Sequence, residues 1–246
     1  MKFQKAIISV LIASGSLILM APAQAATTYF SADFNSTDGG FTTSTVNPFN
    51  GIPKAGWIYG AAAGASGSGG WSTLGEQEDG GSPYEHLLTS QIVTLSASGA
   101  VNLSFDHFYD FEQNWDGGVV NISVNGGAFT QVSAASFTQN GYSGIIQSID
   151  DWGYAGDFNN LNVFTGTTTG FITSQANLGN FNAGDTLRIQ FRGGWDWNGL
   201  GQNELGPNWA IDNVTLTAPV PLPSAAWLFG SVLTGFIGYR RRKTAI

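Results

Sequence analysis

The chain has 246 residues and a formal net charge of −8, with two histidines and no cysteine. The lack of cysteine excludes disulfides, and two histidines alone cannot supply a zinc site of three or four Cys/His ligands. Between residues 26 and 218, three basic residues stand against 17 acidic ones, a formal charge of −14 that argues against direct binding of nucleic acid.

The first 25 residues predict a secretory signal peptide. Lys2 and Lys5 precede an apolar stretch from Ala6 to Met20, and Ala23-Gln24-Ala25 has the small-x-small form of a cleavage site. We expect signal peptidase to cut after Ala25. The segment 26–218, about 190 residues, then suits one domain with a sizeable core.

Residues 26–218 predict short strands separated by Gly-rich turns, which is typical of an antiparallel all-β sandwich or barrel. Strands are expected within 29–35, 84–95, 101–111, 119–124, 129–132, 171–178, 186–192 and 209–217. Loops are expected at 41–57, 60–70 and 193–207. Asn125-Gly126-Gly127 predicts a hairpin turn between two of the strands.

Alternation of apolar and polar residues indicates which faces enter the core. One predicted core face carries Leu103, Phe105, His107, Tyr109 and Phe111, and we expect His107 there as a hydrogen-bonded core histidine. In 186–192 the apolar residues point inward, and the outward residues are Arg188, Gln190 and Arg192. Further core candidates are Leu88, Ile92, Val93 and Leu95.

The last predicted strand suggests a cation site. Ala210, Asp212, Val214 and Leu216 alternate, so Asp212 is expected on the core face. A buried carboxylate needs partners, either backbone N–H groups or a hard cation. Asp33 and Asn35, on one side of the first strand, offer the oxygen ligands that Ca²⁺ prefers. The predicted metal ligands are therefore Asp33, Asn35 and Asp212, and capping of Asp212 by backbone amides is the alternative.

A second group of carboxylates lies in and after the predicted strand 101–111. Asp106, Asp110 and Glu112 share the face opposite the aromatic one, and Asp116 follows. Glycoside hydrolysis uses two carboxylates with different roles, but the spacing here gives no reason to assign an acid and a base. A second cation site, or solvated carboxylates, is favoured, and we predict no catalytic residue.

Tryptophans are frequent in the predicted loops. Trp115, Trp152, Trp195 and Trp197 lie among Gly, Asp and Asn residues. Exposed aromatic faces stack on sugar rings, which makes these four candidate ligand-binding residues. The alternative is that they close the ends of the sandwich.

The end of the chain predicts a membrane-directed segment. Ala225–Tyr239 is apolar and uncharged and would form a helix of about 22 Å, against a hydrocarbon core of about 30 Å. It can therefore span a bilayer only marginally. The cations that follow, Arg240, Arg241, Arg242 and Lys243, favour the cytoplasmic side, so the bulk of the chain would lie outside.

This tail resembles the PEP-CTERM sorting signal of Gram-negative bacteria. The Pro-x-Pro-like motif is Val220-Pro221-Leu222-Pro223, with Leu222 where the name-giving form has Glu, and the Arg-rich end is Arg240-Arg241-Arg242. The resemblance implies processing by an exosortase and a passage through the inner membrane toward the cell surface or matrix. Residues 219–246 are therefore expected to form a sorting unit.

The middle is similar to MAM-like jelly-roll domains of immune-inhibitor-A-type secreted proteins. The resemblance lies in 103–112, in Trp115-Asp116-Gly117-Gly118, in 187–192 and in Trp209-Ala210-Ile211-Asp212-Asn213-Val214. It implies a two-sheet antiparallel sandwich without catalysis, in which Asp33 and Asp212 share a structural cation. Asn213 departs from the second acidic position that often ends such domains.

The sequence therefore predicts an exported, exosortase-sorted protein of the cell envelope or exopolysaccharide matrix, with a structural or adhesive β-sandwich. A glycan-binding module is the alternative, and a polysaccharide hydrolase is a remote one.

Overall fold

The computed structural model describes residues 26–46, 56–60, 63–74, 84–146, 158, 160–195 and 207–218. They belong to one compact unit, Ala26–Pro219. The predicted signal peptide and the predicted sorting tail, with its motif residues, lie outside the described residues. In the part that the structure describes, no helix combines the length and the apolar character needed to cross a membrane.

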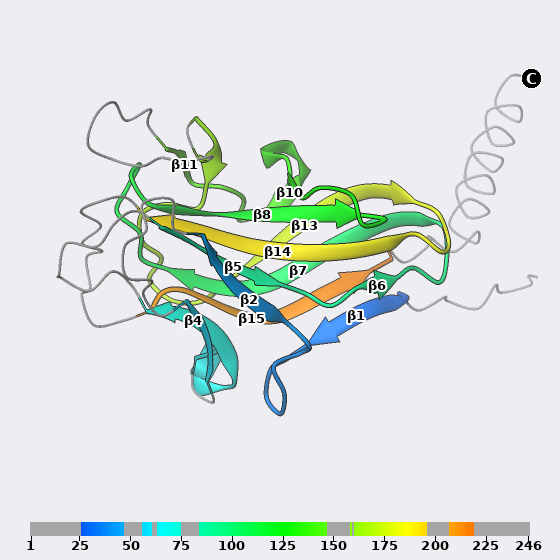
Figure 1. Ribbon diagram of the computed structural model, residues 1–246, viewed down its shortest axis with the longest axis horizontal. Coiled ribbons are helices and arrows are strands. Elements are labelled where there is room, and N and C mark those ends of the chain that lie inside the picture. Colours follow the sequence, from blue (N-terminus) through cyan, green and yellow to red (C-terminus); the bar gives the residue numbers. More distant parts are fainter. Residues whose placement is uncertain are drawn as a thin grey trace, which may run out of the picture. The chain divides into compact units, whose positions relative to one another are not determined.

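The described residues form two antiparallel sheets (Figure 1). The larger one, called the β7 sheet, has the strand order β10-β13-β7-β15-β4-β3, and β1 pairs with β15. Its strands are β10 (Phe137–Gln139), β13 (Ile172–Phe181), β7 (Gly99–Tyr109), β15 (Pro207–Thr217), β4 (Gly70–Leu74), β3 (Trp57–Gly60) and β1 (Thr28–Ala32). The prediction of a two-sheet antiparallel all-β fold is confirmed at this level.

The second sheet, called the β14 sheet, has the order β2-β5-β14-β8-β9, and β6 also pairs with β14. Its strands are β2 (Thr42–Val46), β5 (Tyr84–Thr89), β14 (Thr186–Trp195), β8 (Gly117–Val124), β9 (Thr130–Gln131) and β6 (Val93–Thr94). A small ribbon of β11 (Gly144–Ile145) and β12 (Asn162–Val163) and two single turns, η1 (Ala65–Gly67) and η2 (Ala134–Ser136), complete the described elements.

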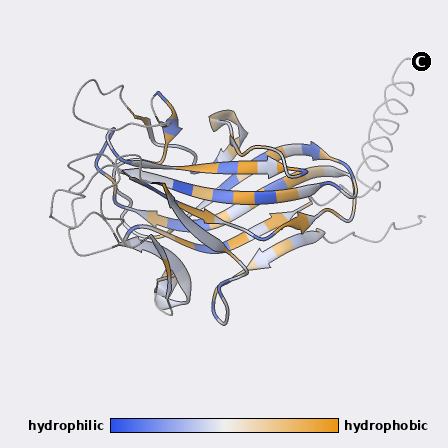
Figure 2. Ribbon diagram, in the orientation of Figure 1, coloured by the Kyte–Doolittle hydropathy of each residue, from blue (hydrophilic) through white to orange (hydrophobic). Residues whose placement is uncertain are grey.

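An aromatic core fills the space between the sheets. The predicted inward face of β7 is confirmed, because Leu103, Phe105 and His107 are fully buried while the residues between them are half-buried. Phe105 contacts Phe191 of β14 at 5.0 Å between ring centroids, which joins the two sheets. The alternation of hydropathy along the strands is visible in Figure 2.

The predicted hairpin is also confirmed. β8 and β9 pair through Asn121 with Gln131 and Ile122 with Thr130. Asn125 and Gly126 at the turn both have positive φ, 52° and 73°, as a two-residue hairpin turn of type I′ requires.

Three element predictions are wrong. β2 lies inside the expected loop 41–57, because its Thr- and Ser-rich sequence lacks the apolar alternation that signals a strand. Ile92 is 65% exposed, since it lies in the turn between β5 and β6 rather than on a core face. β14 continues to Trp195, into the expected loop 193–207.

Candidate functional site

The buried carboxylate of Asp212 lies on the outer face of the β7 sheet, which corrects the predicted orientation. Asn213 has a φ of 50°, and the β15–β7 register shifts between Asp212 and Thr215. This bulge reverses the alternation, so that Trp209 and Ile211 precede it on the core face and Val214 and Leu216 follow on the same face. Asp212 instead pairs with Asp106, opposite the core side of β7.

Three protein donors satisfy the Asp212 carboxylate. Oδ2 accepts from the Ala65 N–H and the Ser68 hydroxyl, both at 2.9 Å, and Oδ1 accepts from the Asn213 N–H at 2.7 Å. The side chain is only 1% exposed. This arrangement is the amide-capped alternative considered from the sequence, with a serine added.

Glycines allow the η1 turn to approach so closely. A Cβ on Gly64 would lie 2.6 Å from Asp212 Oδ2, and one on Gly69 would lie 1.9 Å from the Phe34 carbonyl oxygen. Residues 63–70 therefore contact both the end of β1 and Asp212 of β15.

The other two predicted ligands lie at the end of β1. Asp33 and Asn35 are exposed, and Asp33 Oδ1 accepts from the Asn35 N–H at 3.2 Å. The turn around η1 contacts both this segment and Asp212, but among the described residues no group of three or more His, Asp or Glu side chains converges as a metal site would require. The calcium site stays a prediction.

The structure describes two of the four candidate tryptophans, and only one of these two is exposed. Trp115 is 39% exposed, as the ligand-binding interpretation requires. Trp195 is 1% exposed and contacts Phe111 and His86 at 5.8 and 5.3 Å between ring centroids, so its proposed role as a ligand-stacking residue is wrong. Trp152 and Trp197 lie outside the described residues.

Trp115 sits on a fixed turn between β7 and β8. Its N–H and that of Asp116 both donate to the Glu112 carbonyl, at 3.2 and 3.0 Å. The hydroxyl of Thr165 donates to the same carbonyl at 3.2 Å and accepts from the Asn114 N–H at 2.9 Å. The residues before Trp115 in this turn are polar: Glu112 and Asn114 are half-buried and Gln113 is exposed.

The acidic residues considered for catalysis are held by separate partners. Asp106 accepts from the Thr173 hydroxyl at 2.5 Å and from the Asn213 amide at 2.9 Å. Asp110 is 2% exposed and accepts from the Thr167 hydroxyl at 2.5 Å. Glu112 lies beyond the end of β7, in the Trp115 turn.

His107 is a satisfied core histidine, as predicted. Its Nδ1 accepts from the Trp209 indole at 3.3 Å, so Nε2–H donates to the Ser174 hydroxyl at 2.8 Å, and Ser174 donates to the Asn140 carbonyl at 2.5 Å. Burial lowers the pKa of His107 to about 3 and that of His86 to about 4. Both imidazoles are therefore neutral at pH 7.

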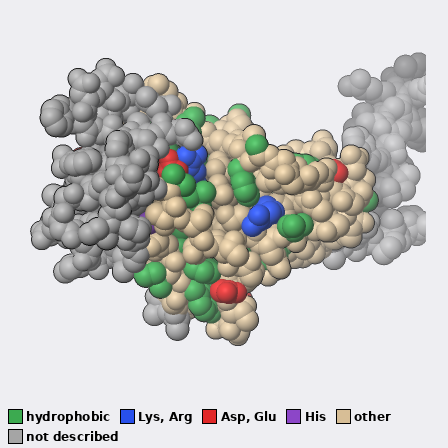
Figure 3. Space-filling model, viewed as in Figure 1, with side chains coloured by type: hydrophobic (Ala, Val, Ile, Leu, Met, Phe, Trp, Pro, Cys, Tyr) green, Lys and Arg blue, Asp and Glu red, His purple; other side chains and the backbone are tan. Residues whose placement is uncertain are grey.

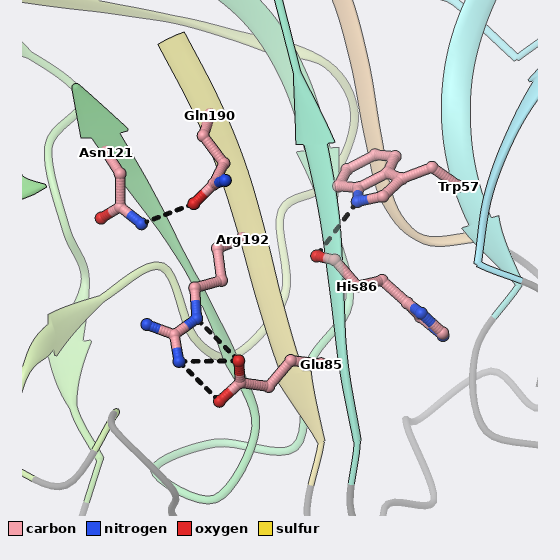
Figure 4. A network of polar contacts seen from close by, with 6 residues as sticks. All are labelled: Trp57, Glu85, His86, Asn121, Gln190 and Arg192. Atoms are coloured by element: carbon pink, nitrogen blue, oxygen red, sulfur yellow. Dashed lines mark hydrogen bonds and ion pairs between the residues drawn. The ribbon is translucent and has the colours of Figure 1, made fainter. Parts of the chain in front are cut away.

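The outer face of the β14 sheet carries a polar network that the sequence did not predict (Figure 4). Arg192 donates to both oxygens of Glu85, through Nε at 2.8 Å and Nη2 at 2.7 Å, and its guanidinium lies 4.9 Å from the Phe158 ring centroid. Asn121 donates to Gln190 at 3.1 Å, and Gln190 donates to Thr89 at 3.2 Å. One sign of this network is present in the sequence. Residues 26–218 contain only three basic residues, and an arginine that is partly buried on a strand needs an acidic partner.

Comparisons with known proteins found no matching protein-family model and no matching curated protein. Among solved structures, the chain is similar to the K1 cleaved adhesin domain of Lys-gingipain from Porphyromonas gingivalis, with 16% identity, a TM-score of 0.43, and coverage of 78% of this chain and 99% of that one. It is also similar to a family 35 carbohydrate-binding module from Clostridium thermocellum, with 15% identity, a TM-score of 0.32, and coverage of 72% and 99%. A CBM35 from Paenibacillus barcinonensis matches with 18% identity, a TM-score of 0.29, and coverage of 77% and 98%. No family is therefore assigned to the chain.

Proposed function

We propose that the sandwich is a non-catalytic glycan-binding module, and the exposed indole of Trp115 is the observation that carries this proposal. A tryptophan that is 39% exposed on a fixed turn leaves an apolar ring face in water. Pyranose rings present apolar C–H faces and polar edges. An indole can stack on the first, and the neighbouring Glu112, Gln113 and Asn114 can hydrogen-bond to the second.

Two of the carboxylates considered for catalysis support a non-catalytic module. Asp106 and Asp110 each accept hydrogen bonds from a threonine hydroxyl, which supports a structural role for both. The two histidines are buried, and burial lowers the pKa of His86 to about 4 and that of His107 to about 3, which does not suit a general base near neutral pH.

The proposal places this module outside the cytoplasm, in the cell envelope or exopolysaccharide matrix. The support is in the sequence: a signal peptide ending at Ala25 and a tail with Pro221, Pro223 and a basic end. Signal peptidase and an exosortase would process the two ends. Intact-mass measurement of the protein from the culture medium and from membranes tests this, and full-length protein in the cytosol contradicts it.

The proposal also keeps a structural Ca²⁺ at Asp33, Asn35 and Asp212. It is supported by the η1 turn, which brings the end of β1 and Asp212 to the same place. The cation would hold these segments together and take no part in glycan binding.

Titration calorimetry with neutral oligosaccharides tests the binding role. Trp115→Ala should weaken binding about fivefold or more, if sugar stacking on the indole contributes as much as base stacking on one aromatic ring, about 1–3 kcal/mol. Ile92→Ala removes another exposed apolar side chain, away from this turn, and should bind as the wild type does. Equal affinities of wild type and Trp115→Ala would reject the site.

A further inference from the structure

The outer face of the β7 sheet carries two rows of uncharged polar side chains. Residues paired directly across antiparallel strands point to the same side of a sheet, so the registers define these rows. The first row crosses five strands through Gln139, Gln175, Ser104, Thr215 and Ser31. The second row crosses four strands through Asn177, Asn102, Thr217 and Thr28. Together they are called the amide–hydroxyl face.

These side chains are available to a partner. Gln139, Gln175, Ser31, Asn177 and Thr28 are exposed, and the rest are half-buried. In the part of the chain that the structure describes, their one side-chain hydrogen bond is from the Gly179 N–H to Asn177 Oδ1. The face therefore presents many donors and acceptors that are bonded to no other protein group.

The absence of charge limits the class of partner. Neither row contains a charged residue. Beside them, Asp106 is already bonded to Thr173 and Asn213, whereas Asp33, two residues after Ser31, is exposed and accepts from the Asn35 N–H. A cationic polymer would find no free carboxylate in the rows, and an acidic polymer would be repelled by the formal charge of −14 on residues 26–218. The rows also lack large apolar side chains, which the buried centre of a protein interface requires.

A polymer of hydroxyl groups fits this face. Hydroxyl and amide side chains both donate and accept, as sugar hydroxyls do. Strands about 4.8 Å apart set the spacing of side chains along each row, which is close to the length of one extended sugar residue. A neutral polysaccharide that lies across the strands could therefore repeat the same hydrogen bonds at each strand.

We propose that the amide–hydroxyl face is a second contact surface, specific for an uncharged polysaccharide. This inference rests on the proposed glycan-binding function. In this proposal the Trp115 turn binds one sugar ring, and the amide–hydroxyl face binds several consecutive sugar residues of the same polymer.

Affinity electrophoresis of the full chain tests the inference. The probes are gels that contain a neutral β-glucan, a neutral mannan or alginate. The triple variant Ser104→Ala, Gln175→Met, Thr215→Val removes the polar groups of three adjacent strands and keeps their size. The control, Thr43→Val with Ser44→Ala, removes exposed hydroxyls from β2 of the other sheet.

The wild type should be retarded by a neutral gel and not by alginate. The triple variant should bind about tenfold or more weakly, because three hydrogen bonds are lost, while the control is retarded as the wild type is. Circular dichroism and thermal unfolding check that each variant is folded. If the triple variant misfolds, Gln175→Glu with Ser104→Asp replaces it, and these carboxylates should weaken retention because they must lose water on contact.

The outcomes separate the inference from the proposed function. Retention of a folded triple variant equal to that of the wild type, with loss of retention by Trp115→Ala, overturns the face and keeps the function. Retention by alginate alone also overturns the face. If no neutral gel retards the wild type, both proposals are wrong.

Discussion

A group of polar side chains on the outer face of the β14 sheet is hydrogen-bonded within the protein, whereas two rows of polar side chains on the outer face of the β7 sheet are left to solvent. On the first, Glu85 binds Arg192, and Asn121 and Gln190 form a hydrogen-bonded row with Thr89. On the second, Gln175, Ser104 and Thr215 form a row without such bonds in the described structure. Polarity by itself is therefore not a sign of binding, because only polar groups without an internal partner are available to a ligand.

The surface view shows the charged side chains near the β14 sheet. Figure 3 shows two basic patches on the described part of the molecule, and one of them adjoins an acidic patch. The described basic residues are Arg188 and Arg192, both from β14. Charge on this side of the sandwich is thus partly neutralised within the protein.

The largest expected effect comes from breaking the pair on the β14 sheet. Glu85→Ala leaves the Arg192 guanidinium, with a side chain 18% exposed, without the carboxylate that binds it, and should lower the free energy of unfolding by about 3 kcal/mol. Urea unfolding at pH 7 measures it. The matched change on the other face, Gln175→Ala, should stay within about 0.5 kcal/mol of wild type. Similar losses in the two variants would contradict the difference between the faces.

On the outer face of the β7 sheet, Asp212 differs from the two polar rows because its carboxylate has hydrogen-bond partners within the protein. Asp212→Ala removes the acceptor of two N–H groups and one hydroxyl and should cost about 2–3 kcal/mol, because the buried Ala65 N–H loses its partner. Asp33→Ala, at an exposed site, should change stability by less than about 0.5 kcal/mol. A comparable loss in Asp33→Ala would mean that Asp33 is not merely solvated.

Acidification should destabilise the core between the sheets. The folded pKa of His107 is about 3 and that of His86 about 4, against 6.5 for an unperturbed histidine. The unfolded state therefore takes up protons first, and stability falls as the pH drops below about 6.5 and continues to fall until about pH 3–4. Between pH 7 and 5 each histidine should contribute a loss of about 2 kcal/mol.

Urea unfolding at the two pH values measures this loss in wild type and in His107→Gln. The variant cannot titrate at position 107, so its stability should fall by about 2 kcal/mol less than that of the wild type over the same interval. An equal pH dependence in both proteins would show that His107 does not remain neutral in the folded state.

Calcium should have the smallest effect. At ten times its dissociation constant, a cation that binds the folded state adds about 1.4 kcal/mol, or a rise in Tm of about 3–5 °C. Asp33→Ala removes a proposed ligand without touching the hydrogen bonds of Asp212, so calcium should not raise its Tm. A wild-type Tm that is the same with calcium and with chelator contradicts the cation site.

The sequence predicted those parts of the fold in which side chains alternate regularly. β7 was predicted because apolar and polar residues alternate along it, and the β8–β9 hairpin because Asn-Gly adopts the required positive φ. β2 was missed since its threonines and serine show no apolar face. The orientation of Asp212 was missed because the bulge at Asn213 depends on one backbone angle, which alternation does not report.

Two glycine-rich segments were predicted as loops, but glycines in both lie in close contact with other parts of the chain. Gly193 and Gly194 suggested a loop before Trp195, but they are strand residues that make room for rings. A Cβ on Gly193 would lie 2.6 Å from the Trp195 ring, and one on Gly194 would lie 2.8 Å from the Phe158 ring. At Gly64 and Gly69 the close neighbours are a carboxylate and a carbonyl from distant segments. Such neighbours are tertiary contacts, which local sequence does not specify.

The most direct measurement of the central claim is the affinity of the full-length wild type for a neutral polysaccharide, compared with that of Trp115→Ala and of the Ser104, Gln175 and Thr215 triple variant. We predict measurable binding by the wild type, a loss of about fivefold or more in Trp115→Ala and a loss of about tenfold or more in the triple variant. No binding by the wild type, or unchanged binding by both folded variants, would contradict it.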